Sequence, residues 1–393
     1  MFFKLFKFNK LWIIINHFSN LIENSMCGKI LKITERVGKE ILDFCGIWLF
    51  HFRKKRILTI DQLRKILVLR LDQRIGNGIM LLPLLKAIRQ RLPQIELHLL
   101  LHQPVSDIFE KFSAGIIDTF YPYQQEKLLT HPALFLSWLN TLRKQRYDLI
   151  ISSHNPDNFS LSQAFLGWWC RPKMMIGFSW QKSVAYYDVA VPSSPDKHYA
   201  DAQLDLWRYF DPATKLVWGG LHISNSHLKR LSQKYSMNIS EPTVLLWLGA
   251  TGNKVLPFRL ISLLYEECIK HFGYKVVVAV GPNDEKILQN FPEEFQKEVL
   301  IWRYPLKDTL IFLATQRAFI SGDTGPAHLA AVLGLPMLTI FINSKSEQYG
   351  YHDGERRFAI VYDGSSESEE TIITAIKKIA ESIIHEDKPQ PNQ

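Results

Sequence analysis

Residues 320–336 read ISGDTGPAHLAAVLGLP, and this stretch predicts a buried strand, a short polar loop and a helix in direct succession. The helix is expected over residues 326–333, because proline suits the first turn of a helix. Upstream, residues 309–320 are expected to form an amphipathic helix followed by a short apolar strand. The loop 322–325 then joins a strand end to a helix start, where unpaired backbone N–H groups attract anions such as phosphate.

Four residues of this stretch are candidate ligand contacts. Asp323, Thr324 and Gly325 lie in the loop, and His328 lies one turn inside the helix. Together they predict a small-molecule anion site, with Thr324 as a hydroxyl donor. The alternative is that Asp323 and Thr324 cap the helix and that His328 packs in the core.

Apolar segments alternate with helical patterns on both sides of this stretch. Strands are expected at residues 66–71, 97–101, 149–152 and 174–176, with an edge element at 186–191. A second unit is expected to have strands at residues 243–248, 275–280, 319–320 and 337–341. Helices are expected at residues 81–91, 133–145 and 367–385. Strands that alternate with helices predict doubly wound parallel sheets, in which ligands bind beyond the carboxyl ends of the strands.

The predicted fold class is therefore α/β, with two doubly wound Rossmann-like domains that face a cleft. The first domain is expected over residues 65–222 and the second over residues 223–385, with a linker region at 211–225. Residues 1–64 form an N-terminal prefix, predicted to be helical, and residues 386–393 form a tail that is predicted to be disordered.

The charge of the chain is concentrated at its start. The 393 residues carry a net charge of +9, and residues 1–70 alone hold 14 Lys and Arg against 5 Asp and Glu. The neutral remainder argues against nucleic-acid binding, which needs a basic face on the folded domain. The four cysteines are widely spaced, so neither a zinc site nor a disulfide framework is expected, and no other pattern predicts a metal.

The N-terminal prefix mixes aromatic residues with lysine and arginine. This composition suits the headgroup layer of an anionic membrane, and it suits equally an extra helical layer packed on the folded domains. No run of 18 apolar residues occurs in the sequence, so a spanning helix is not expected. A cytoplasmic location is predicted, with peripheral attachment to the inner face of the cytoplasmic membrane as an option for the prefix.

Three segments, taken in order, resemble glycosyltransferase family 9, the bacterial heptosyltransferases. They are KILVLRLDQRIGNGIMLLPLLKAIRQR at residues 65–91, WLGATGNKVLPFRLISLL at 247–264, and the Asp-Thr-Gly-x-x-His-Leu pattern that begins at Asp323. The resemblance covers residues 65–385 and implies the two-domain architecture called GT-B. It also implies an inverting, metal-independent enzyme without a cofactor. Its partners would be a nucleotide-sugar donor, expected to be ADP-linked, and a lipopolysaccharide or other cell-surface glycan acceptor, to which it would transfer a heptose-like sugar.

The resemblance also implies roles for further residues. Thr251 and Lys254 would hold the donor phosphates, alongside the loop at Asp323. Glu285 would accept hydrogen bonds from the ribose hydroxyls, with Asp284 as the alternative. Simple helix capping by Asn283 or Asp284 is the other interpretation of this segment.

One position departs from the family pattern. Family members place a carboxylate directly after a glycine in the loop that follows the first strand, but this chain has Asn77 there. An amide orients an acceptor but cannot take its proton at neutral pH. Asp72, Asp157 and His154 are the candidate replacements. The departure leaves two other hypotheses, a non-catalytic protein that binds sugar nucleotides or glycans and a nucleotide-sugar epimerase of the same architecture.

Overall fold

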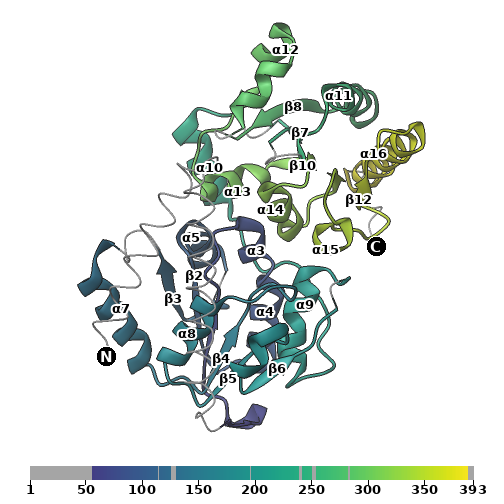
Figure 1. Ribbon diagram of the computed structural model, residues 1–393. Helices are drawn as coiled ribbons and strands as arrows, with labels where there is room; N and C mark the ends of the chain where they lie inside the picture. Colours follow the sequence, from purple (N-terminus) through teal and green to yellow (C-terminus); the bar gives the residue numbers. More distant parts are fainter. Residues whose placement is uncertain are drawn as a thin grey trace, which may run out of the picture.

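The computed structural model describes residues 55–113, 115–124, 130–194, 196–238, 241–249, 254–281 and 284–387. Within these ranges the chain forms two six-stranded sheets in two domains that lie one above the other (Figure 1). All neighbouring strands pair in parallel. The predicted α/β class with two Rossmann-like domains is confirmed. Residues 1–54 of the prefix, Thr251 and Asn283 lie outside the described residues.

The first sheet has the order β3-β2-β1-β4-β5-β6. Its strands are β1 (Lys65–Leu69), β2 (Glu96–His102), β3 (Thr119–Tyr123), β4 (Leu149–Ser152), β5 (Met174–Phe178) and β6 (Val189–Val191). The central strands are continuous apolar runs because helices bury both faces of the sheet. These helices are α3 (Ile75–Ile79), α4 (Leu82–Arg91), α5 (Gln103–Phe112), α7 (Pro132–Lys144), α8 (Leu161–Trp169) and α9 (Tyr199–Arg208).

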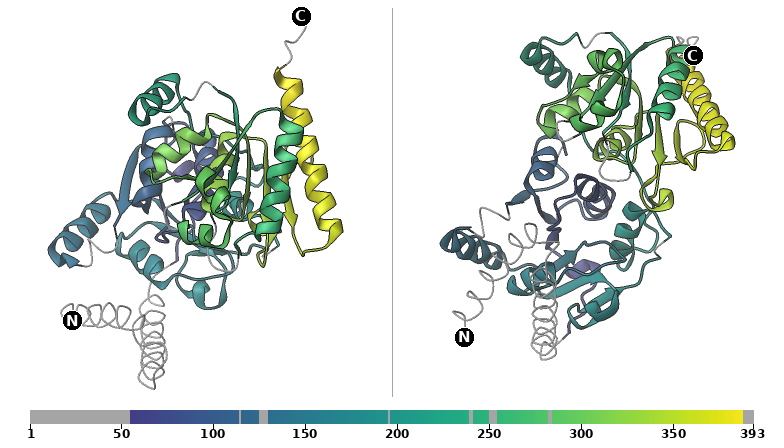
Figure 2. Two further views of the ribbon diagram at one scale, coloured as in Figure 1. Left: turned by 90° about the horizontal axis from the view of Figure 1, so that it is seen from above. Right: turned by 45° about the horizontal axis from the view of Figure 1, so that its top comes forward.

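The second sheet has the order β12-β11-β10-β7-β8-β9. Its strands are β7 (Thr243–Trp247), β8 (Lys275–Val280), β9 (Leu300–Ile301), β10 (Gln316–Gly322), β11 (Met337–Phe341) and β12 (Arg357–Val361). Its helices are α10 (Asn225–Tyr235), α11 (Phe258–Phe272), α12 (Glu293–Glu298), α13 (Leu306–Leu313), α14 (Gly325–Leu333), α15 (Ser346–Tyr349) and α16 (Ser366–Asp387). Helix α16 packs alongside α11 on the outer side of this domain (Figure 2).

Three edge strands, β3, β9 and β12, were not predicted. The second unit was expected to end with the strand at 337–341, which is wrong, because β12 adds a further parallel strand beside β11. Strand β3 likewise extends the first sheet beside β2, and its sequence TFYPY contains a proline. Edge strands are paired on one side only, so they tolerate proline and partial exposure and lack a strong apolar signature. The predicted linker region, except its last residue, lies in the segment without helix or strand between α9 and α10.

The two domains are packed together rather than merely tethered. Helix α3, which follows β1, packs against α14, which follows β10, and α5 packs against α13. A single cluster of buried apolar side chains also runs from the first sheet into the second, from Ile66 and Val68 to Leu245 and Phe319. The carboxyl ends of the two central strands are therefore brought to one site. Among the described residues, no helix is long and apolar enough to cross a membrane.

Candidate active site

The loop between β10 and α14 occupies the predicted position at a strand end and a helix start. Thr324 is the N-cap residue of α14 and has an extended backbone, but its side chain makes no capping hydrogen bond. Capping therefore does not occupy the Thr324 hydroxyl, contrary to the alternative interpretation. Pro326 has no N–H and the Ala327 N–H donates to the Thr324 carbonyl at 3.1 Å, so in the first turn of α14 the Thr324 hydroxyl and the Gly325 N–H are left for an anion.

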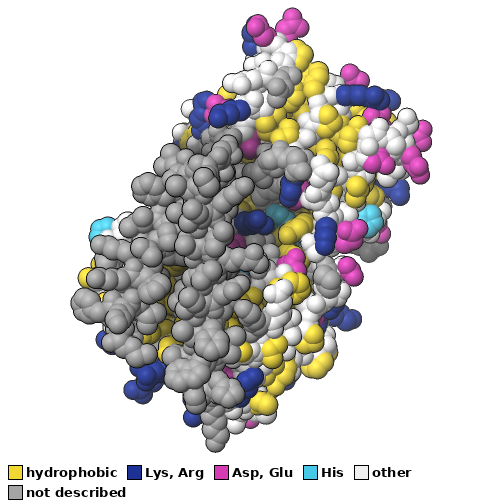
Figure 3. Space-filling model, viewed as in Figure 1, with side chains coloured by type: hydrophobic (Ala, Val, Ile, Leu, Met, Phe, Trp, Pro, Cys, Tyr) yellow, Lys and Arg dark blue, Asp and Glu magenta, His cyan; other side chains and the backbone are white. Residues whose placement is uncertain are grey.

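Lys254 and Asp323 form the charged part of this loop. The Lys254 Nζ lies 2.5 Å from the Asp323 Oδ2, so the loop after β7 is joined to the loop after β10. Asp323 is almost buried, with 8% of its side chain exposed, whereas 31% of the Lys254 side chain is exposed. The ammonium group is thus accessible beside the start of α14. In the space-filling view, Lys and Arg side chains and a histidine lie where the two domains meet (Figure 3).

His328 lies one turn into α14 and contacts both domains. Its Nδ1 is hydrogen-bonded to the Tyr351 hydroxyl at 2.8 Å. Its other ring nitrogen lies against Gly76 of α3, so closely that a Cβ atom at Gly76 would be 2.5 Å from Nε2. Burial lowers the pKa of His328 to about 4, although the Asp323 carboxylate opposes this shift. The ring is therefore neutral at pH 7 and acts as a hydrogen-bonding group.

Asn77 lies on α3 and is buried beside one of the candidate acids. Its Nδ2 donates to the Asp72 Oδ2 at 3.3 Å. The same carboxylate accepts from the Arg70 Nε at 2.6 Å, and its Oδ1 accepts from the Arg74 backbone N–H at 3.1 Å. Arg70 is itself buried and donates to the Ser153 carbonyl at 3.1 Å. Where the family has its expected base, this chain therefore has the Asn77 amide, whose Nδ2 donates to a carboxylate that is also hydrogen-bonded by Arg70 and Arg74.

The other two candidate bases lie in the loop after β4. The Asp157 Oδ2 accepts a hydrogen bond from the Tyr199 hydroxyl at 2.6 Å. The His154 Nδ1 accepts from the Asn155 backbone N–H at 2.7 Å. Burial, and then the nearby Arg70 charge, lower the pKa of His154 to about 4, so this side chain is neutral. Both residues belong to the first domain.

The two acids considered as ribose contacts, Glu285 and Asp284, follow β8 and make different contacts. Glu285 pairs with Arg303 through two hydrogen bonds of 2.9 and 2.8 Å, at an exposed position. The carboxylate of Asp284 lies instead against Gly249 in the loop after β7. Burial raises the pKa of Asp284. Of the two acids, Asp284 is therefore the one that lies against the loop leading to Lys254.

Sequence reasoning missed two side chains that border the site. The Tyr351 hydroxyl is hydrogen-bonded to the ring of His328, and the Tyr199 hydroxyl donates a hydrogen bond to Asp157. Neither belongs to a recognisable motif, and each contacts a residue far away in the chain. Among the described residues, no three His, Cys, Asp or Glu side chains are grouped as they would be around a metal ion.

Comparisons with known proteins agree with the two sequence motifs of the second domain, at residues 247–264 and from Asp323. A model of glycosyltransferase family 9 (heptosyltransferase) matches residues 135–370. Lipopolysaccharide heptosyltransferase 1 of Campylobacter coli is 24% identical over 310 residues, which span 70% of this chain and 83% of that protein.

Solved structures share the fold. The E. coli ADP-heptose LPS heptosyltransferase II has a TM-score of 0.64 at 16% identity, covering 82% of this chain and 100% of that one. A family 9 glycosyl transferase of Veillonella parvula has a TM-score of 0.61 at 19% identity, covering 84% of this chain and 97% of that one. Because the family model spans more than half of the sequence, the predicted resemblance is confirmed. The chain is a glycosyltransferase of the GT-B architecture and belongs to glycosyltransferase family 9, the heptosyltransferase family.

Proposed function

We propose that the protein is an inverting, metal-independent glycosyltransferase. It would move a heptose-like sugar from an ADP-linked donor to lipopolysaccharide or another cell-surface glycan. The observation that carries this proposal is the Lys254 and Asp323 pair at the start of α14, beside the neutral His328. An ammonium group and a helix N-terminus together neutralise the charge of a departing diphosphate, which is the function that a metal ion has in other transferases.

Donor and acceptor groups are divided between the domains in this proposal. The donor diphosphate would lie at α14 in the second domain, and the acceptor would lie over α3 in the first. Inversion needs the acceptor hydroxyl to attack the reacting carbon from the side opposite the leaving diphosphate, while a base takes the proton of that hydroxyl. The packing of α3 against α14 supports this arrangement, because it places Asn77 and Asp72 across from the donor loop.

We assign the proton-accepting role to Asp72. Its carboxylate lies next to the amide that replaces the family's acid, and 24% of its side chain remains exposed. Asn77 and Arg70 would then position this carboxylate. Asp157 is the weaker candidate, because it lies in the loop after β4, whereas Asp72 is hydrogen-bonded to the Asn77 amide that replaces the family's acid.

Replacing Asp72 by asparagine is expected to lower kcat about 100-fold or more with little change in donor affinity. Single-turnover transfer and calorimetric donor binding would measure the two effects. Asp157→Asn is the matched control, and loss of kcat in that variant alone would assign the base to Asp157. If neither wild type nor Asn77→Asp transfers sugar from ADP-, GDP-, UDP- or dTDP-linked donors, the alternative of a sugar-nucleotide or glycan-binding protein is favoured.

The prefix offers a route to a membrane-embedded acceptor. We propose that residues 1–54 hold the enzyme on an anionic membrane surface through interleaved aromatic and basic side chains. The described chain begins at Lys55, which donates to the Val184 carbonyl, followed by Arg56, whose N–H donates to Asp188. A deletion that ends at residue 54 therefore keeps these contacts to the first domain.

Deleting residues 1–54 is expected to release the protein from liposomes that contain anionic lipids, while donor binding is kept. Each basic residue near such a surface contributes about 1 kcal/mol, and the attraction weakens with salt. Cosedimentation at low and high salt would measure it. Equal sedimentation of the full-length and shortened proteins would contradict the anchor, and failure of the shortened protein to fold would favour the packed helical layer.

A further inference from the structure

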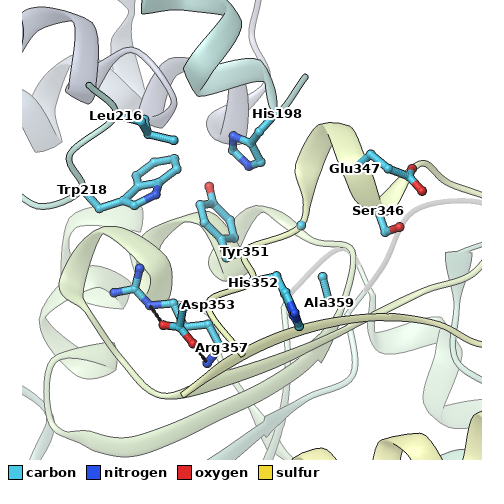
Figure 4. Close-up of a pocket in the computed structure, with 11 residues that line it drawn as sticks. His198, Leu216, Trp218, Ser346, Glu347, Tyr351, His352, Asp353, Arg357 and Ala359 are labelled. Atoms are coloured by element: carbon cyan, nitrogen blue, oxygen red, sulfur yellow. Dashed lines mark hydrogen bonds and ion pairs between the residues drawn. The ribbon is translucent and has the colours of Figure 1, made fainter. Parts of the chain in front are cut away.

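A cavity of about 370 Å³ lies between the two domains and is bordered by Tyr351, the residue that is hydrogen-bonded to His328. His198, the N-cap residue of α9, and Trp218 of the linker form its wall on the side of the first domain (Figure 4). Tyr351 and Asp353, between α15 and β12, and Arg357, the first residue of β12, form the facing wall. Its volume is within the range of small-molecule sites. None of the roles proposed above uses it.

Aromatic rings make up the inner part of this cavity. The Trp218 and Tyr351 ring centroids are 4.9 Å apart, and both rings also lie edge-on or tilted to His198, at 5.4 and 5.0 Å. Trp218 is half-buried and borders the cavity, whereas Tyr351 is buried. The negative face of an aromatic ring attracts weakly positive C–H groups, so these rings suit the C–H face of a ligand ring.

The charges of the cavity argue against an anionic ligand. Two carboxylates, Glu347 and Asp353, border it together with one guanidinium, that of Arg357, and the imidazole of His352. Burial lowers the pKa of His198 to about 4, so this ring adds no positive charge at pH 7. A phosphate or carboxylate would therefore meet net negative charge.

The charged side chains of the cavity also argue against a wholly apolar ligand. Such a ligand would remove water from these charges without forming hydrogen bonds or ion pairs with them. Asp353 is fixed by hydrogen bonds from the backbone N–H groups of Glu355, Arg356 and Arg357, of 3.0, 2.8 and 2.9 Å. Glu347 is exposed at the rim, next to Ser346 on α15. Carboxylate and hydroxyl oxygens around aromatic faces suit a ligand that has several hydroxyl groups and an apolar ring face.

We propose that this cavity is a saccharide subsite that holds a neutral sugar ring of the acceptor glycan, distinct from the donor loop. Trp218 packs on the ring, and Glu347 and Ser346 accept hydrogen bonds from its hydroxyls. The assignment to the acceptor rests on the proposed function, whereas saccharide binding by the cavity does not. The bound ring would contact Tyr351, the residue that holds His328 of the donor loop.

The test uses the full-length protein and a delipidated core oligosaccharide released from lipopolysaccharide by mild acid. Saturation-transfer NMR without donor is expected to detect binding, and Trp218→Leu is expected to weaken it about tenfold or more through loss of one aromatic face. Trp218→Phe is expected to restore most of the binding. Trp138→Leu, on α7 in the first domain, is the matched control and is expected to bind like wild type.

Three results would overturn the subsite. They are no binding by wild type, equal binding by Trp218→Leu, and competition by inorganic phosphate at millimolar concentration. Loss of ADP-sugar affinity in Trp218→Leu would also overturn it, because Trp218 would then act as a structural contact between the domains. Failure of the enzyme to transfer sugar from any donor would defeat the proposed function alone, since oligosaccharide binding is measured independently.

Discussion

Replacing Lys254 by alanine is expected to lower kcat/KM for the nucleotide sugar about 100-fold or more. The change removes the ammonium group beside the start of α14, and it leaves the Asp323 carboxylate unpaired next to the incoming diphosphate. The diphosphate loses its attraction to the ammonium group and is repelled by the Asp323 carboxylate, and both effects weaken donor binding. Because Asp323 is nearly buried, solvent screens this repulsion poorly. Donor titration by calorimetry and initial rates of transfer would measure the effect.

The matched control is Lys270→Ala, which removes an exposed lysine from the last turn of α11. It should bind the donor like wild type. The double variant Lys254→Ala with Asp323→Ala should bind donor better than Lys254→Ala alone, because the uncovered carboxylate is gone. Wild-type affinity in Lys254→Ala would place the diphosphate elsewhere.

Replacing Gly76 by alanine is expected to abolish transfer by forcing the domains apart. The new Cβ would lie 2.3 Å from the His328 Cδ2, a distance that real contacts do not allow. The His328 ring cannot easily retreat, because it is buried and hydrogen-bonded to Tyr351. We therefore expect α3 to move away from α14, and small-angle X-ray scattering should show a larger radius of gyration.

Removing the ring that causes the clash provides the control for this prediction. Gly76→Ala combined with His328→Ala should restore the wild-type radius of gyration while remaining inactive, because the proposed donor site includes His328. His328→Ala alone should be compact. A compact and active Gly76→Ala protein would show that the contact between α3 and α14 is not rigid.

The parts of the molecule that depend on local pattern could be predicted from the sequence. Glycine, proline and apolar spacing within 320–336 predict the end of β10, the loop and α14, and short apolar runs predict the inner strands. Contacts between distant segments could not be predicted. No local signal indicates that Tyr351 holds His328, that Asn77 turns its amide towards Asp72, or that Glu285 turns to Arg303. Each contact depends on how separate strand ends meet after folding.

The apolar cluster shared by both sheets restricts how such a chain can acquire a new donor specificity. Exchange of whole halves between relatives would join two apolar surfaces that were never selected to fit each other, and mismatched packing destabilises by several kcal/mol. Changes confined to the loops at the strand ends leave that surface intact. Divergence of donor specificity is therefore expected to proceed by substitutions in these loops rather than by recombination of the two halves.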